Sequence, residues 1–269
     1  MTTNHKFFLN LAFQIAEKNL GQTGHNPSVG SIVVKNNSVI SSGVTSINGR
    51  PHAEFNALNN VKDIAGSTLY TSLEPCIHRG KTPPCTNIII KKKIKNVFFG
   101  FEDPDQRTYK KAKKILSRKG IKTKLVSTKK NVNFYRSYLI NKKLKIPFIS
   151  AKIAITKDYF TINKNDKWIT NSFSRKITHL IRSKHDGILS TSKSINYDNA
   201  LLNCRIEGLN KYKPDLFIID LNLKLKKNLL LNKILKKRKT YLITCKTNFK
   251  KAQIYKKKGY KIIFINSLA

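Results

Sequence analysis

The spacing of one histidine and two cysteines constrains this chain more than any other feature of its sequence. His52-Ala53-Glu54 stands at the start of a predicted helix, while Pro75-Cys76 and Pro84-Cys85 follow a predicted strand and begin the next helix. One imidazole and two thiolates supply three ligands of a tetrahedral zinc site and leave the fourth position open, which is the ligand count of a catalytic site. The sequence therefore predicts a fold that brings His52, Cys76 and Cys85 together.

Glu54 lies two residues after this histidine. At that spacing its carboxylate can lie beside a metal ion without binding it and can carry protons, which typically contributes about 10²- to 10⁴-fold in rate. Zinc nucleobase deaminases have the pattern H-x-E followed by P-C-x-x-C, and this chain matches it in part, with a longer loop between the cysteines. The alternative is a core histidine and a structural zinc, for which His78 is the extra candidate ligand nearby.

Strand and helix patterns alternate along the first half of the chain. The predicted elements are helices over 5–20, 52–60, 106–119 and 130–146, a helix opened by Pro84, a hairpin over 30–40, and strands over 68–72, 97–101 and 122–126. Such alternation is typical of an α/β fold.

Ile146-Pro147 is the clearest break after these elements, and we place a domain boundary there, giving predicted domains over 1–146 and 147–269. The second half is again α/β. Its predicted elements are strands over 148–155, 187–190, 216–220, 241–244 and 260–266, a helix over 172–183, and basic helices between the last strands.

The composition bears on partners and location. The formal charge of +39 would suggest nucleic acid, but the lysines are spread over the whole chain among many Asn and Ile residues, and basic and aromatic residues do not alternate as a base-stacking platform requires. We therefore expect a small anionic substrate and no nucleic acid. With four cysteines and no apolar run near the roughly 18 residues of a membrane span, we expect a cytoplasmic protein without a disulfide framework or membrane partner.

The loop between the two cysteines indicates which family of deaminases this sequence resembles. Residues 73–85, which read LEPCIHRGKTPPC, closely resemble the signature of the bifunctional riboflavin-biosynthesis deaminase/reductase family. Asn26-Pro27-Ser28-Val29-Gly30, His52-Ala53-Glu54 and Glu102-Asp103-Pro104 agree with this resemblance. It implies a cytidine-deaminase-like three-layer domain followed by a dihydrofolate-reductase-like α/β domain.

The resemblance also implies the reactions and the residues of the first site. The family deaminates a phosphoribosylamino-diaminopyrimidinone at the ring carbon bearing the 2-amino group and then reduces the ribosyl group to ribityl with NADPH. By matching motif positions, His52, Cys76 and Cys85 would bind zinc and Glu54 would be the proton donor. Asn26 would contact the pyrimidine, and Lys81 would hold the phosphorylated substrate, as a basic residue facing a phosphate can.

The second half resembles the family's reductase domain at Lys152-Ile153-Ala154 and Trp168-Ile169-Thr170. The implied NADPH contacts are Ala154, Trp168, Ser194 and Asp198, and the implied substrate contacts are Arg182, Leu202 and Arg205.

Several positions depart from the family pattern. Thr156-Lys157-Asp158-Tyr159 stands where the family has Ser-Leu-Asp-Gly, Asp166 replaces a substrate-contacting Ser, and Ser194 replaces a Thr. The sequence also ends soon after its last predicted strand, where the family has a Gly-rich segment with a substrate-binding Glu. We therefore expect a C-terminally shortened reductase domain with weak or absent reduction, and an exposed edge strand over 260–266.

Three alternatives stay open at the level of sequence. A tRNA adenosine deaminase shares the His-Ala-Glu element and would use the positive charge. A non-enzymatic RNA-binding protein on a deaminase scaffold would not need an intact Glu54 and ligand set. A deaminase with a non-catalytic second domain is the third alternative. The sequence also leaves open whether the protein forms a homo-oligomer.

Overall fold

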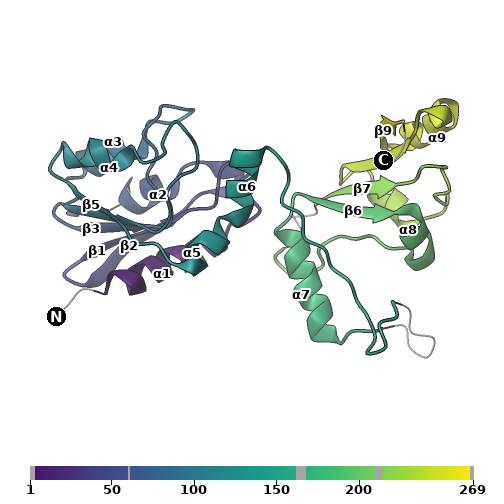
Figure 1. The fold of residues 1–269 in the computed structure, drawn as a ribbon, viewed down its shortest axis with the longest axis horizontal. Coiled ribbons are helices and arrows are strands. Elements are labelled where there is room, and N and C mark those ends of the chain that lie inside the picture. The colour runs from purple at the N-terminus through teal and green to yellow at the C-terminus, as the bar shows by residue number, and fades with distance from the viewer. Residues whose placement is uncertain (1–3, 60, 162–167, 210–213, 267–269) are drawn as a thin grey trace. The chain divides into compact units, whose positions relative to one another are not determined.

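The computed structural model describes residues 4–59, 61–161, 168–209 and 214–266 (Figure 1). The chain divides into two compact units, residues 1–150 and 151–269. The domain boundary predicted after residue 146 stays a prediction. In the described part of the chain, no helix is both long enough and apolar enough to cross a membrane.

The first unit is built on a five-stranded mixed sheet in the order β2-β1-β3-β4-β5. Its strands are β1 (Gly30–Lys35), β2 (Ser38–Val44), β3 (Thr68–Thr71), β4 (Asn96–Phe99) and β5 (Lys122–Leu125). β1 runs antiparallel to β2 and β3, whereas β3, β4 and β5 are parallel. The predicted hairpin is confirmed: Asn36 and Asn37 both have positive φ, as a two-residue turn between twisted strands requires.

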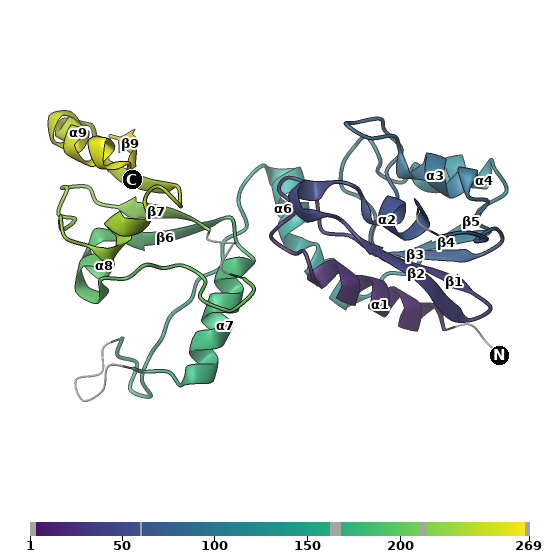
Figure 2. The same cartoon turned by 180° about the vertical axis from the view of Figure 1, so that it is seen from behind.

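Helices cover both faces of this sheet, so the predicted three-layer architecture is confirmed (Figures 1 and 2). The helices are α1 (His5–Glu17), α2 (Ala53–Asn59), α3 (Cys85–Lys91), α4 (Ala112–Ser117), α5 (Lys129–Phe134) and α6 (Arg136–Leu144), with a 3-10 turn at η1 (Ile47–Gly49). α1 and α5 lie on one face, and α2, α3 and α4 lie on the other.

Two glycines let helices approach the sheet closely. A Cβ at Gly30 would lie 2.0 Å from the carbonyl oxygen of Ala12 in α1, and a Cβ at Gly43 would lie 2.4 Å from the carbonyl oxygen of Ala53 in α2. Neither contact is compatible with a side chain. The position of the start of α2, where His52 and Glu54 lie, therefore depends on Gly43.

Apolar clusters fill the space between the helices and the sheet. One cluster packs beneath α2, α3 and α4 and includes Leu58, Leu69, Ile89 and Leu116, all fully buried. The opposite face carries Phe8, Leu9, Ile32, Tyr70 and Phe98. Burial of this kind is the main source of stability for short helices.

The second unit contains a four-stranded parallel sheet in the order β6-β7-β8-β9. Its elements are α7 (Ser172–Ser183), β6 (Gly187–Thr191), α8 (Ser192–Asp198), β7 (Asp215–Ile219), η2 (Leu230–Ile234), β8 (Thr240–Cys245), η3 (Lys246–Asn248), α9 (Phe249–Lys258) and β9 (Lys261–Ile265). Among the described residues β9 pairs with β8 alone, so the last strand lies at an edge of this sheet, as predicted. The short helix α8 was not predicted.

The strand predicted over 148–155 was wrong. The structure assigns no strand there, and Ile149 and Ile153 are 81% and 72% exposed. An apolar pattern yields a strand only where a neighbouring strand takes up its hydrogen bonds and a core takes up its side chains. In the described part of the sheet, β6 pairs with β7 alone.

The helix predicted over 106–119 is shorter than expected, because only 112–117 is helical. Lys110 has a positive φ of 57°, which a helix does not allow. The backbone N–H groups of Lys110 and Ala112 donate to the buried carboxylate of Glu74 instead. A contact from a distant segment thus decided where α4 begins.

Candidate functional site

The structure brings His52, Cys76 and Cys85 together. Their ligand atoms all lie within 4.8 Å of one another, and no other such group of His, Cys, Asp or Glu occurs among the described residues. The Nδ1 atom of His52 is 3.6 Å from the sulfur of Cys76 and 3.4 Å from that of Cys85. Tetrahedral zinc with ordinary Zn–S and Zn–N bonds places such atoms about 3.6 Å apart. The donor set therefore fits a zinc ion.

Three separate elements supply these side chains. His52 directly precedes α2, Cys76 lies beyond the end of β3, and Cys85 is the first residue of α3. The backbone N–H of Cys85 donates to the sulfur of Cys76 over 3.3 Å, and the N–H of Thr86 donates to the carbonyl oxygen of Cys76. The N–H groups at the start of α3, which have no partner within the helix, are thus hydrogen-bonded to Cys76.

The pKa values of the two cysteines shift in opposite directions. A hydrogen bond from Cys85 lowers the pKa of Cys76 to about 4, with a further contribution from His52. The same hydrogen bond, together with burial, raises the pKa of Cys85 well above its usual range. A hydrogen bond to Cys76 raises the pKa of His52. Binding of a metal ion would therefore release protons from this cluster.

Glu54 is the buried carboxyl group of the cluster. It lies in the first turn of α2, is 4% exposed, and is hydrogen-bonded with the Cys85 side chain. Burial, followed by the charge of Cys76, raises its pKa to about 7. A carboxyl group with a pKa near neutrality can accept a proton and return it within one catalytic cycle.

His78, the candidate fourth ligand of a structural zinc, is not part of the cluster. Its Nδ1 atom lies 3.2 Å from the hydroxyl oxygen of Thr108. The ligand set in the described residues therefore has three members, as a catalytic site does.

Glu74 holds the segment between the end of β3 and Cys76 in place, a role that was not predicted from the sequence. Its two carboxylate oxygens accept the backbone N–H groups of Asp103, Lys110 and Ala112 over 3.1–3.2 Å. Burial raises the pKa of Glu74, and these three hydrogen bonds oppose the rise. Its position next to Pro75-Cys76 was the only available signal in the sequence.

The two predicted substrate residues of the first unit lie on loops. Asn26 donates from its Nδ2 atom to the carbonyl oxygen of Gly49, three residues before His52. Lys81 is exposed on the loop between the two cysteines. Next to it, the hydroxyl of Thr82 accepts a hydrogen bond from the guanidinium of Arg50, which ties this loop to the segment before His52.

In the second unit, the predicted substrate residues lie close together. The guanidinium of Arg182 donates to the carbonyl oxygen of Asn203, and that of Arg205 lies 3.4 Å from the imidazole Nε2 of His179. Leu202 has a positive φ of 52°. The three residues therefore meet where α7 contacts the segment 201–205.

The predicted NADPH contacts are spread over several segments. Ser194 and Asp198 lie near the two ends of α8. Ala154 is half-buried in the irregular segment that precedes α7. Trp168 stacks with the guanidinium of Arg175 at 4.4 Å. Asp166, the replacement expected to disfavour a phosphate, lies outside the described residues.

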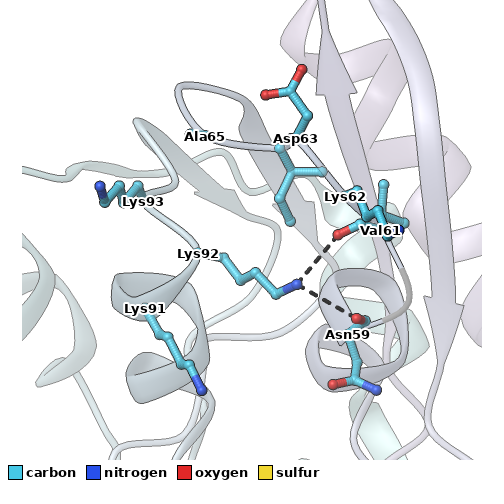
Figure 3. Close-up of a pocket in the computed structure, with 9 residues that line it drawn as sticks. Asn59, Val61, Lys62, Asp63, Ala65, Lys91, Lys92 and Lys93 are labelled. Carbon is cyan, nitrogen blue, oxygen red and sulfur yellow. Dashed lines mark hydrogen bonds between the residues drawn. The ribbon is translucent and has the colours of Figure 1, made fainter.

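A surface hollow of about 490 Å³ lies at the far ends of α2 and α3 (Figure 3). Lys92 crosses it and donates to the carbonyl oxygens of Asn59 and Val61, as a lysine at a helix C-terminus commonly does. The seven residues of α2 span about 10 Å between this hollow and His52. The hollow is therefore separate from the metal-ligand cluster.

Comparison with known proteins agrees with this geometry. The family model described as the cytidine and deoxycytidylate deaminase zinc-binding region matches residues 2–101, and the model of the RibD C-terminal domain matches residues 147–266. Among solved structures, Acinetobacter baumannii RibD superposes with a TM-score of 0.84 at 24% identity, covering 98% of this chain and 74% of that one. A Thermotoga maritima deaminase/reductase superposes with a TM-score of 0.80 at 25% identity, covering 97% and 80%.

Curated relatives show the same similarity in sequence. The riboflavin biosynthesis protein RibD of Aquifex aeolicus is 33% identical over 97% of this chain and 73% of its own length. That of Bacillus amyloliquefaciens is 33% identical over 81% of this chain, and the match spans 60% of the relative's length. This chain belongs to the RibD family of riboflavin-biosynthesis proteins.

Proposed function

We propose that the first unit catalyses the hydrolytic deamination of a phosphoribosylamino-diaminopyrimidinone in riboflavin biosynthesis. The observation that carries this proposal is the contact of the His52 imidazole with both cysteine sulfurs, with the buried carboxyl group of Glu54 beside them. A zinc ion held by these three side chains would supply a Lewis acid that activates water at neutral pH.

Glu54 moves the protons of the reaction. It accepts a proton from the attacking water and donates it to the ring nitrogen. It then accepts the proton of the hydroxyl group that has been added to the ring carbon and delivers it to the amine, so that the carbon–nitrogen bond breaks, ammonia departs and a carbonyl group remains. A pKa of about 7 suits both directions of transfer, since neither protonation state is strongly disfavoured at neutral pH. Burial also keeps bulk water from competing for these protons.

The loop and its neighbours orient the substrate. Asn26 contacts the pyrimidine, and the ammonium group of Lys81 binds the phosphate by a charge-assisted hydrogen bond. The tether between Arg50 and Thr82 supports this assignment, because it limits the positions that the loop can adopt and adds a second positive charge near Lys81.

The second unit binds NADPH and the ribosyl phosphate of the deaminated product. Ala154, Trp168, Ser194 and Asp198 contact the cofactor, while Arg182, Leu202 and Arg205 contact the substrate. The grouping of Arg182 and Arg205 at one segment supports this assignment. Hydride transfer needs reacting atoms held to within about 1 Å, and these contacts would hold the nicotinamide and the ribosyl carbon in that geometry.

The test is ammonia release from the diaminopyrimidinone phosphate by the zinc-loaded chain. Glu54→Gln should retain zinc and the unfolding temperature but lose about 10²-fold or more of its turnover, since an amide cannot carry the proton. Glu17→Gln, at an exposed position in α1, is the matched control and should behave as the unaltered chain. Near-normal turnover of Glu54→Gln would refute the assignment. Selective deamination of a tRNA at physiological salt would instead favour the adenosine deaminase alternative.

A further inference from the structure

Arg238 is a buried cation held by backbone carbonyls. It lies two residues before β8 and is 4% exposed. Its Nε atom donates to the carbonyl oxygen of Pro214 over 2.6 Å, and its two Nη atoms donate to the carbonyl oxygens of Leu201 and Leu202 over 2.6 and 3.1 Å. Within the described chain it has no salt bridge to a carboxylate. Burial, and then the charge of Arg182, lower the pKa of Arg238 to about 10.

The segment that receives these bonds has no regular secondary structure of its own. Residues 201–205 are neither helix nor strand, and Leu202 adopts the left-handed conformation, which costs a branched residue free energy. The next carbonyl, that of Asn203, accepts hydrogen bonds from His179 over 2.9 Å and from Arg182 over 3.3 Å. Three consecutive carbonyls are therefore oriented by side chains from other elements.

The same segment ends in Arg205, whose guanidinium lies beside His179. Asn203 and Cys204 are buried, so the segment is attached to the core at its centre. These two buried residues leave the chain little room to compensate for a change in the backbone at Leu202, so such a change would alter the position of Arg205 relative to Arg182. Arg182 acts on Arg205 and on Arg238 as a like charge, and the carboxylate of Asp215 opposes this only at Arg238. The positions of these arginines must therefore be set by something other than mutual attraction.

We propose that Arg238 is a positioning residue that sets the backbone of residues 201–205 and so places Leu202 and Arg205 for the anionic substrate. The inference rests on the proposed role of Arg182 and Arg205 in binding that substrate. A guanidinium suits this task because it directs several donors in one plane, whereas the ammonium group of a lysine cannot reach three separate carbonyls in fixed directions.

The experiment measures binding of ribose 5-phosphate to the full zinc-loaded chain by titration calorimetry. Arg238→Lys keeps the positive charge and should lower the affinity by about tenfold or more through misplacement alone. Lys239→Gln removes an exposed charge from the adjacent position and is the matched control, which should bind as the unaltered chain does. Deamination by the first unit reports in each variant that the preparation is active.

A second readout separates positioning from a general loss of stability. Hydrogen exchange of the amides of residues 201–205 should accelerate in Arg238→Lys while the amides of β7 and β8 keep their protection. In Arg238→Ala, added methylguanidinium should restore part of the affinity for ribose 5-phosphate. Equal affinities of Arg238→Lys and the unaltered chain would refute the inference alone. Absence of binding by the unaltered chain would refute the proposed substrate site, and the inference with it.

Discussion

Asp103 should make the first unit less stable as the pH rises towards neutrality. Its carboxyl group is 6% exposed and accepts hydrogen bonds from the N–H of Asp105 over 2.9 Å and from the hydroxyl of Tyr138 over 3.1 Å. Burial outweighs these bonds and raises its pKa from 3.8 to about 6. The folded protein therefore holds this proton more tightly than the unfolded chain does.

The sign and size of the effect follow from this difference. The stabilisation is present at low pH and is lost as the pH rises from about 4 to 6, because the folded carboxyl group must then ionise in a buried place. At 1.36 kcal/mol per pKa unit, the shift to about 6 corresponds to about 3 kcal/mol in total. About 1.4 kcal/mol of this lies between pH 5 and pH 8.

Asp103→Asn should remove this dependence. The amide oxygen can still accept both hydrogen bonds, but it does not ionise. In urea unfolding of the zinc-loaded protein, the free energy of unfolding of the unaltered chain should fall relative to that of Asp103→Asn by about 1.4 kcal/mol between pH 5 and pH 8. Asp63→Asn, whose side chain is 90% exposed, is the control and should give a parallel pH profile. Parallel profiles for Asp103→Asn as well would show that burial does not raise this pKa.

Further predictions concern the metal, the packing and the charge. Cys76→Ser and Cys85→Ser should each lose zinc in metal analysis while Cys245→Ser retains it, and full occupancy in the first two would contradict the ligand assignment. Gly30→Ala should lower the free energy of unfolding by about 3 kcal/mol or more in thermal or urea unfolding, because its Cβ would meet the carbonyl oxygen of Ala12 at 2.0 Å; a smaller loss would mean that α1 shifts at little cost. Binding of RNA by this chain of charge +39 should be sequence-indifferent and fall steeply with added salt in filter-binding assays, and salt-resistant selectivity would contradict the expectation of a small substrate.

The sequence was most informative where the signal is local. The helical spacing of apolar residues predicted α1, and the Asn36-Asn37 turn predicted the β1–β2 hairpin, since both depend on neighbouring residues alone. The identities of His52, Cys76 and Cys85 predicted a zinc site because few other residue types bind that ion. The strand predicted over 148–155 was wrong because its apolar pattern is a local signal, whereas forming a strand requires a pairing partner from a distant segment. In the described part of the second sheet, β6 pairs with β7 alone.

Tertiary structure alone decided the properties that depend on distant segments. Nothing near Glu54 in sequence gives it a pKa of about 7; that value comes from burial and from Cys76, which reaches it across the fold. Glu74 likewise sets the start of α4 through N–H groups far along the chain. Residue type and local spacing therefore specified which chemical groups this protein has, whereas desolvation and long-range contacts, which exist only after folding, decided their protonation and geometry.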